Sequence, residues 1–563
     1  MNLSGWLAAL LLLPTAACTQ SVLTIPADAQ NVARQVRPAN IEAHMRYLAD
    51  DKLRGRKPGT PGYELAAQYV EKQFRDLGFR PAGQPGTYRQ AVPLRKAQVR
   101  EEVSSVALVR NGLEQPLTIG RNVLLSPNFG QPVSEVTAEV VFVGFGVSAP
   151  ELGYDDYVGP TGQGIDVRGK IVACFNGAPA TFPSNQRAYS GSAKQEVAAA
   201  RGAVGLITFS LPTDMQARIE SNAPRNRLAV YRWTDAAGRA QRTFPQLRVV
   251  ASLGDSTARA LFADAPASFE KARLAANQSQ PQAFGLNVSV RARTQTELTD
   301  GLVGENIVGL LPGTDPALTD EYVVYVSHLD HLGVTKPVNG AGSPGAGTPG
   351  DYINNGAHDN ASGVAINLEA ARLFSLLPKK PRRSILFVAV TGEEMGLLGS
   401  DYFASNPTVP KNKIVANLCL DMPFFFHPLL DIVPYGAEHS SLNAATEAAA
   451  RFVGVQIAKD PIPEQAVFMR SDHFSFVRQG IPAIYIKSGS TTGDGRDGTR
   501  LNLDWRATTY HTPQDDMSQP FDWSAAARHV QLQFLIGYLT AQADARPVWN
   551  PGDFFGTKFG KAQ

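Results

Sequence analysis

The sequence has little that would mark a disulfide-stabilised, nucleic-acid-binding or membrane-spanning protein. Only 3 of its 563 residues are cysteine, which excludes a framework of disulfide bonds. Its 53 basic and 51 acidic residues balance, so nucleic acid is not expected as a partner. Beyond the N-terminus no apolar run has membrane-spanning length. What remains is a chain that must build its own hydrophobic cores, and its length predicts two or three domains.

The N-terminus has the layout of a secretory signal peptide. An apolar stretch from Trp6 to Leu13, too short to span a bilayer, precedes Pro14-Thr15-Ala16-Ala17-Cys18. The last three residues resemble the end of a bacterial lipobox, in which the cysteine is lipidated, although Thr15 stands where an aliphatic residue is usual. We therefore predict that residues 1–18 are an export signal and that the protein resides in the periplasm or cell envelope. Whether Cys18 carries a lipid anchor stays open.

The remaining chain changes its pattern twice. Residues 40–80 have apolar residues at helical spacing, and from about 135 short strands are punctuated by Gly, Pro and Asn. From about 300 strands alternate with helices, which predicts an α/β fold with a mostly parallel central sheet and helices on both faces. The expected units are an N-terminal part of the main domain (31–134), a β-rich domain (135–290), the main domain (291–545) and a C-terminal tail (546–563). The Gly/Pro-rich stretch from Gly333 to Gly356 is expected to be a surface loop, either a mobile rim of the site or a solvated insertion.

Three predicted strands of the main domain are followed by acidic or imidazole groups. The strand that begins at residue 322 leads to His328, the strand 384–390 to Glu393 and Glu394, and the strand 414–420 to Asp421. In open α/β sheets, ligands gather at the carboxyl ends of the strands. Each group alone is compatible with a solvated charge at a strand end. Their joint occurrence instead predicts a functional site.

Five side chains form the predicted metal-ligand set. Two imidazoles and three carboxylates suit a pair of Zn²⁺ ions, because one carboxylate can bridge the ions while each keeps a position for water or substrate. Asp359 lies on a tight turn before a helix, where helix capping is the alternative role, and Pro513 favours a loop around His511. Co²⁺ or Mn²⁺ would also suit such mixed ligands. The set is His328, Asp359, Glu394, Asp421 and His511.

The predicted catalytic groups, Glu393 and Tyr510, each lie directly before a predicted metal ligand in the sequence. Because neighbouring residues in helix-like backbone diverge by about 100°, Glu393 and Glu394 should not bind one metal in the same way. We predict that Glu394 ligates and that Glu393 is the general base, which takes a proton from water and passes it to the departing amine. Tyr510 could donate a hydrogen bond to the developing oxyanion. In extended backbone Asp330 would share a face with His328 and hold its imidazole, whereas His331 would point elsewhere.

The residues resemble those of the M28 peptidases, which are zinc exopeptidases and mostly aminopeptidases. The resemblance lies in Ser327-His328-Leu329-Asp330-His331, Gly356 to Gly363, Thr391-Gly392-Glu393-Glu394, Leu420-Asp421-Met422, Ser471-Asp472-His473 and Tyr510-His511-Thr512-Pro513. It implies that His328, Asp359 and Asp421 bind one zinc and that Asp359, Glu394 and His511 bind the other, with Asp359 bridging. His358 departs from the family pattern, in which a small or acidic residue is expected. Asp472 and His473 either line the substrate pocket or form a solvated helix start.

The segment before the main domain resembles a protease-associated (PA) domain, a module that commonly shapes substrate access. The matching stretches are Tyr154-Asp155-Asp156-Tyr157, residues 164–172 and residues 199–205. The combined prediction is an exported di-zinc aminopeptidase that acts on peptides. A carboxypeptidase of the glutamate carboxypeptidase type, a catalytically silent peptide-binding protein and a glutaminyl cyclase relative are the alternatives. Retention of every predicted ligand and of the base argues against the silent protein, and the cyclases resemble single-zinc versions of the fold.

Overall fold

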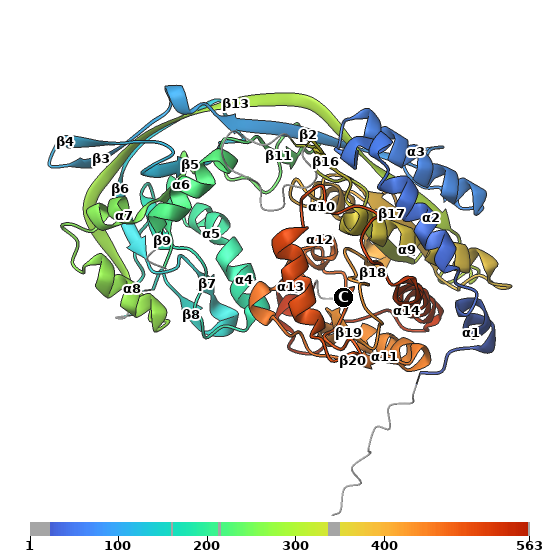
Figure 1. The fold of residues 1–563 in the computed structure, drawn as a ribbon. Helices are drawn as coiled ribbons and strands as arrows, with labels where there is room; N and C mark the ends of the chain where they lie inside the picture. The colour runs from blue at the N-terminus through green and yellow to red at the C-terminus, as the bar shows by residue number, and fades with distance from the viewer. Residues whose placement is uncertain (1–22, 159–161, 212–214, 336–349, 561–563) are drawn as a thin grey trace, which may run out of the picture.

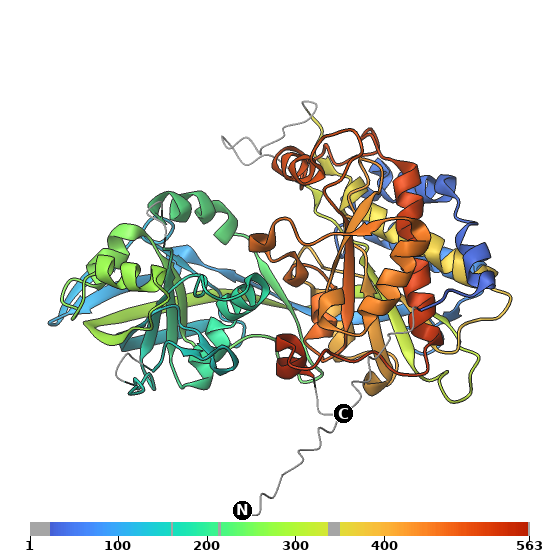
Figure 2. The same ribbon diagram turned by 90° about the horizontal axis from the view of Figure 1, so that it is seen from below.

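The protein consists of two lobes joined by two long strands (Figures 1 and 2). The computed structural model describes residues 23–158, 162–211, 215–335 and 350–560. The predicted export signal 1–18 and residues 336–349 of the predicted surface loop lie outside the described residues. Within those ranges, no helix combines the length and the apolar character that crossing a membrane requires. We call the lobe that contains residues 300–560 the large lobe and the other the small lobe.

A mixed sheet forms the centre of the large lobe. Its four central strands run parallel, and β13 and β19 flank them in the antiparallel direction. The central strands are buried along almost their whole length, which explains their continuous apolar sequences. This confirms the predicted α/β class with a mostly parallel sheet. In order of pairing, the strands are β19 (Asp431–Tyr435), β21 (Ala483–Ser488), β18 (Ile414–Cys419), β14 (Tyr322–His328), β17 (Ser384–Val390) and β13 (Ala283–Leu311).

Helices cover both faces of this sheet, and the alternation of side chains along β14 divides them between two cores. Val323 and Tyr325 face one core, whereas Val324 and Val326 face the other. The hydroxyl of Tyr325 donates to the carbonyl of Gln533, and a side chain at Gly537 would collide with that hydroxyl. The first core contains α2 (Pro38–Leu48), α3 (Pro61–Asp76), α9 (Ser362–Leu376), α11 (Leu442–Val453) and α14 (Trp523–Gln542). The second contains α10 (Leu398–Ser405), α12 (His473–Val477) and α15 (Phe554–Phe559).

The segment 40–80, predicted as helical, is divided by a turn. Between α2 and α3 lies η1 (Asp51–Arg56), in which Arg54 and Gly55 have positive φ values of 47° and 67°. A Cβ at Gly55 would lie 2.4 Å from the carbonyl oxygen of Asn354, so the close approach of another chain segment requires glycine. Arg56, 1% exposed, donates to the carbonyl oxygens of Leu329 and Gly356, among others. The turn thus places the guanidinium of Arg56 in the interior, where its hydrogen bonds connect two loops.

The small lobe has its own core around a parallel sheet. Three helices pack on the sheet, and Phe142, Phe175 and Phe209 lie at the centre of the core. The core also includes Val106 from β3 (Ser105–Arg110), so its strands begin well before residue 135, where the β-rich domain was expected to start. The sheet strands are β6 (Val133–Val143), β9 (Ile171–Phe175), β10 (Gly205–Phe209) and β12 (Val249–Leu253). The helices are α5 (Lys194–Ala200), α7 (Asp255–Leu261) and α8 (Phe269–Asn277).

Two antiparallel strands carry the chain between the lobes. β13 pairs with β2 (Arg89–Val99) and arches over the molecule (Figure 1). This 29-residue strand was not expected, because Asp300-Gly301 carries turn signals in its middle. The structure accommodates these residues as an irregularity between Thr299 and Leu302, where the register with β2 shifts. Because β13 pairs with β17 in the large lobe and with β6 in the small lobe, it connects the sheets of the two lobes.

The lobes also meet away from the arch, through α4 (Ser184–Ser192) of the small lobe. Tyr189 of α4 is 9% exposed and belongs to the second core of the large lobe. Its ring makes edge contacts with Phe554, Phe555 and Phe559 of α15. The small lobe is therefore anchored to the large lobe away from the arch as well.

Candidate metal centre

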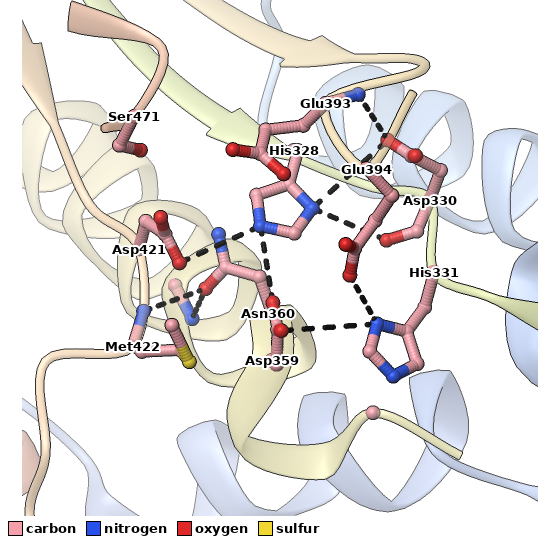
Figure 3. A network of polar contacts seen from close by, with 12 residues as sticks. His328, Asp330, His331, Asp359, Asn360, Glu393, Glu394, Asp421, Met422 and Ser471 are labelled. Carbon is pink, nitrogen blue, oxygen red and sulfur yellow. Dashed lines mark hydrogen bonds and ion pairs between the residues drawn. The ribbon is translucent and has the colours of Figure 1, made fainter. Parts of the chain in front are cut away.

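The predicted site forms at the carboxyl ends of β14, β17 and β18. His328 is the last residue of β14, Glu393 and Glu394 lie on the turn after β17, and Asp421 follows β18 (Figure 3). Because these strands are parallel neighbours, their ends deliver all four side chains to one edge of the sheet. Asp359 arrives from the turn before α9, at a cis peptide bond with Asn360. The edge of the sheet thus collects groups that lie up to about 90 residues apart.

Asp359 faces two imidazoles with its two carboxylate oxygens. Its Oδ1 lies 3.3 Å from Nε2 of His328, which is also 3.5 Å from Oδ1 of Asp421. Its Oδ2 lies 3.3 Å from Nε2 of His511, which is also 3.1 Å from Oε2 of Glu394. The five predicted ligands therefore form two groups that share Asp359. This is the arrangement required of a carboxylate that bridges two cations.

His331 also lies in the site, and the prediction that it would point elsewhere is wrong. Its Nδ1 lies 2.6 Å from Oε1 of Glu394 and 4.0 Å from Oδ2 of Asp359. Alternation failed here because β14 ends at His328, and beyond it the chain no longer has extended backbone. With Asp359 and Glu394, His331 forms a second group of closely spaced potential ligands, besides that of His328, Asp359 and Asp421. Two imidazoles thus contact Glu394, His331 at Oε1 and His511 at Oε2.

Asp330 holds the site in a different way from the one predicted. Its carboxylate Oδ1 is 3.9 Å from Nδ1 of His328, whereas its own backbone carbonyl is 3.2 Å from that nitrogen. The same Oδ1 accepts the backbone N–H of Glu393 at 3.2 Å. Asp330 therefore orients the imidazole chiefly through its main chain, and its fully buried side chain fixes the turn that carries Glu393.

Asp515, which the sequence analysis missed, positions the bridging carboxylate. Its Oδ1 accepts the backbone N–H of His358 at 2.8 Å, and its Oδ2 accepts that of Asp359 at 2.9 Å. Asp515 is completely buried, and burial raises its pKa to about 6. Its position four residues after His511 gave no periodic or motif signal. His358 itself packs among aromatic rings that include Phe426 and Trp505, and within the described residues its ring nitrogens have no hydrogen-bond partner.

The charge of the site suits metal cations. Four carboxylates, those of Asp359, Glu393, Glu394 and Asp421, lie together, and in the described part of the chain no Lys or Arg forms an ion pair with any of them. Oδ1 of Asp421 and Nε2 of His511 are buried without a hydrogen-bond partner among the described residues. Buried anions need paired charges, and a mixed set of imidazole and carboxylate ligands suits Zn²⁺. The donor set therefore fits zinc.

The same field acts on the imidazoles. Burial lowers the pKa of His511, but its contacts with Asp359 and Glu394 outweigh burial and raise it to about 10. Burial likewise disfavours the charged form of His328, and the nearby carboxylates, Glu393 first, raise its pKa well above the ordinary value. The carboxylates thus favour positive charge at both rings, as is expected in a site that binds metal ions.

A pocket of about 410 Å³ opens beside the ligands. Glu393 faces into it, and burial together with the charges of Glu394 and Asp421 raises the pKa of Glu393 well above its usual value. Tyr510 stacks on His511 with ring centroids 3.7 Å apart. The lining residues are Asp359, Glu393, Asp421, Met422, Gln465, Val467, Arg470, Tyr485, Arg506 and Tyr510. The predicted base and the predicted oxyanion donor therefore share one pocket.

Two arginines of this pocket escaped the sequence analysis. Arg470 is exposed, and Arg506 lies with its guanidinium 5.1 Å from the centroid of the Tyr510 ring. Within the described ranges no carboxylate lies at ion-pair distance from either guanidinium. The residues predicted next to Arg470 behave differently: Asp472 and His473 are completely buried and do not line the pocket. Their reading as a solvated helix start is wrong, because α12 begins inside the core.

The comparisons with known proteins agree with this geometry. Residues 306–536, which carry all five predicted ligands, match peptidase family M28. This part of the chain is thus similar to the M28 zinc aminopeptidases. Leucine aminopeptidase 1 of Trichophyton rubrum is 26% identical over 246 residues, which are 42% of this chain and 58% of the relative. Leupeptin-inactivating enzyme 1 of Streptomyces exfoliatus is 29% identical over 206 residues, 35% of this chain and 38% of the relative.

The chain thus aligns with less than two thirds of the length of these relatives. Among solved structures, an aminopeptidase from Aneurinibacillus sp. strain AM-1 superimposes with a TM-score of 0.47 at 20% identity, covering 93% of this chain and 98% of that one. The structure of an M28 peptidase precursor from Shewanella amazonensis gives a TM-score of 0.39 at 18% identity, with coverage of 93% and 98%.

Proposed function

We propose that this M28 protein is a zinc-dependent aminopeptidase with two metal positions, which removes N-terminal residues from peptides. The observation that carries the proposal is the position of Asp359, whose two oxygens face His328 with Asp421 on one side and His511 with Glu394 on the other. Relatives that bear the name leucine aminopeptidase support the choice of peptide substrates and of the N-terminal end.

The residues of the pocket have distinct roles in peptide hydrolysis. His328, Asp359 and Asp421 would hold one zinc, and Asp359, Glu394 and His511 the other; bound zinc supplies Lewis-acid polarisation of the substrate carbonyl and acidifies water. Glu393 accepts the proton of the attacking water and transfers it to the departing amine. Its turn is held by Asp330, which keeps the base in place. Tyr510 donates its hydroxyl to the oxyanion.

A carboxypeptidase is the second candidate, and the two arginines of the pocket favour it. A C-terminal carboxylate is recognised by a guanidinium, which can donate two parallel hydrogen bonds, and both Arg470 and Arg506 are available for this. The α-ammonium group of an aminopeptidase substrate would instead be held by a carboxylate. The same arginines would also suit an aminopeptidase whose peptide substrates carry a nearby carboxylate.

A panel of peptides separates the two candidates. The panel contains one tetrapeptide in four forms: free, N-acetylated, C-amidated and blocked at both ends, each with and without a chelator. An aminopeptidase cleaves the free and C-amidated forms only, and the chelator abolishes cleavage. Cleavage of the N-acetylated form with release of the C-terminal residue would overturn the aminopeptidase in favour of the carboxypeptidase. Cleavage of no form by zinc-loaded protein would favour a silent binding protein.

We also propose that the protein is exported, on the basis of the N-terminal pattern from Trp6 to Cys18. The small lobe, which includes the stretches that resemble a PA domain, would then shape access to the site, because α4 rests against the segment that lines the catalytic pocket. Fractionation of cells that produce the full chain, with mass spectrometry of its mature N-terminus, tests export and the lipidation of Cys18. A cytoplasmic protein with an intact N-terminus would contradict export.

A further inference from the structure

A second pocket lies in the small lobe, and its lining residues all precede the predicted metal ligands in the sequence. It contains about 580 Å³ of empty space, open solvent included, and opens between the end of β5 (Val123–Leu125), β11 (Val230–Trp233) and the turn before β12. None of the groups proposed for catalysis lines it. We call it the Arg232 pocket, and its lining residues are Ser126, Pro127, Asn128, Phe129, Gln195, Val230, Arg232, Arg242, Thr243, Phe244, Pro245, Leu247 and Val250.

Arg232 brings a largely desolvated positive charge to this pocket. Burial, followed by the charge of Arg242, lowers its pKa. Its guanidinium lies 5.4 Å from the centroid of the Phe129 ring, and one of its nitrogens donates to the carbonyl of Tyr231 at 2.8 Å. In the part of the chain that the structure describes, no carboxylate lies within ion-pair distance of Arg232. A guanidinium has five N–H donors, so most of those of Arg232 are left for a ligand.

Arg242 adds a second positive charge that is only weakly balanced. Its guanidinium is 3.9 Å from Oδ1 of Asp401, which belongs to α10 of the large lobe. The other oxygen of Asp401 accepts the indole N–H of Trp233 at 2.8 Å. One carboxylate at a long distance thus faces two guanidinium groups. Like charges that share a partly buried site repel each other, and an anion placed between them would relieve this repulsion.

The rest of the wall determines which anion fits. Phe129, Phe244, Leu247 and Val250 contribute apolar surface, and Asn128 and Gln195 contribute amides. A bare inorganic anion would leave this apolar surface in contact with water. A carboxylate attached to an apolar group would place its charge at the guanidinium groups and its apolar part against the rings.

From this arrangement we propose that the Arg232 pocket is a binding site for a carboxylate with an apolar substituent, such as the free C-terminus of a short peptide that ends in an aliphatic residue. Arg232 donates two parallel hydrogen bonds to the carboxylate, and Arg242 adds charge from the half-exposed side. The site lies where β11 joins the arch and where Asp401 reaches it from the large lobe, so a ligand there contacts the junction of the two lobes.

Calorimetry with full-length, zinc-loaded protein tests the proposal. The protein carries Glu393→Gln to prevent turnover, together with Arg470→Gln and Arg506→Gln, so that the guanidinium groups of the catalytic pocket do not contribute. N-acetyl-leucine as the free acid and N-acetyl-leucine amide are the probes. We expect the acid to bind at least about tenfold more tightly than the amide, because only the acid supplies the anion.

Further variants assign the binding to the pocket. In this background, Arg232→Gln is expected to weaken acid binding at least about tenfold, and Arg232→Lys to restore only part of it, because lysine lacks the two-pronged geometry. Arg242→Gln at the exposed edge is expected to weaken binding less, and it keeps the test valid should Arg232→Gln not fold. Arg248→Gln is the matched control, an exposed arginine of the same lobe outside the pocket, and it should leave binding unchanged.

Three results would overturn the proposal. The first is equal binding of the acid and the amide, and the second is unchanged acid binding in both Arg232→Gln and Arg242→Gln. The third is binding of inorganic phosphate more tightly than the acid, which would make the pocket a general anion site. The readout is binding and not peptide cleavage, so failure of the proposed peptidase activity would leave this result interpretable.

Discussion

The carboxylate of Asp515 accepts the backbone N–H of Asp359 at 2.9 Å, and through that bond it holds the residue that both metal positions share. Asp515→Ala is expected to weaken zinc binding about 10- to 100-fold, the usual effect of losing a group that orients a ligand. Titration with zinc against a competing chelator measures this. Asp516→Ala is the control, because the neighbouring carboxylate caps Ser518 and does not contact the site. Equal zinc affinity in both variants would contradict the role of Asp515.

Replacement of the proposed base should separate metal binding from turnover. Glu393→Gln keeps the shape of the side chain but cannot accept a proton, so we expect peptide cleavage to fall about 10²- to 10⁴-fold. Metal analysis of the same preparation should find the zinc content of the wild type. Near-normal cleavage by Glu393→Gln would exclude Glu393 as the base, and loss of zinc would make it a ligand.

The different contacts of His331 and His511 predict unequal effects of two substitutions. We expect His511→Ala to lose one zinc per chain after dialysis, because Nε2 of His511 reaches both Asp359 and Glu394. His331→Ala should retain both zincs but bind one of them more weakly, since His331 contacts Glu394 closely and Asp359 only at 4.0 Å. Atomic absorption measures the content. The reverse pattern would place His331 in the ligand set and His511 outside it.

A buried histidine away from the metal ligands predicts how stability depends on pH. His529 is completely buried, and burial lowers its pKa to about 3 from the ordinary 6.5. The unfolded chain therefore binds a proton that the folded chain rejects. The free energy of unfolding should fall as the pH drops from about 6.5 towards 3, by at most about 1.4 kcal/mol per pH unit from this residue.

His529→Met should reduce that slope, as measured by urea unfolding of metal-free protein at several pH values. Ser488→Ala is the control, since it removes the contact of Ser488 with Nε2 of His529 but keeps the titrating ring. Equal slopes in His529→Met and in the wild type would show that His529 does not contribute.

The anchoring of the small lobe by Tyr189 predicts a large effect of one substitution and a small effect of another. Tyr189→Ala empties the space between the rings of α15 and should destabilise the protein by about 3 kcal/mol. It should also raise KM, because Tyr189 shares a core with Val467, which lines the catalytic pocket. Glu151→Gln breaks the nearby ion pair with Lys558 and should cost less than about 1 kcal/mol. Denaturant titration compares them, and equal losses would contradict the anchoring by Tyr189.

Much of the site could be predicted because its residues follow strands. The strand Ser384–Val390 has the predicted bounds. Its apolar sequence predicted that Glu393 and Glu394, which follow it, would lie at the edge of a sheet. Groups outside such runs could not be placed. Asp515 acts through main-chain bonds, and His331 follows the point where extended backbone ends, so neither has a periodic signal.

The sequence by itself predicted the parallel strands and the five candidate ligands that follow or face them, because strands buried on both faces of a sheet have continuous apolar sequences. Only the tertiary structure decided that Asp359 faces two imidazoles, that Arg470 and Arg506 enter the catalytic pocket, and that Arg232 and Arg242 share another. Those relationships join residues from different elements, and the distances between them depend on how helices and lobes pack. The sequence of a single helix or strand does not show how it packs against the others.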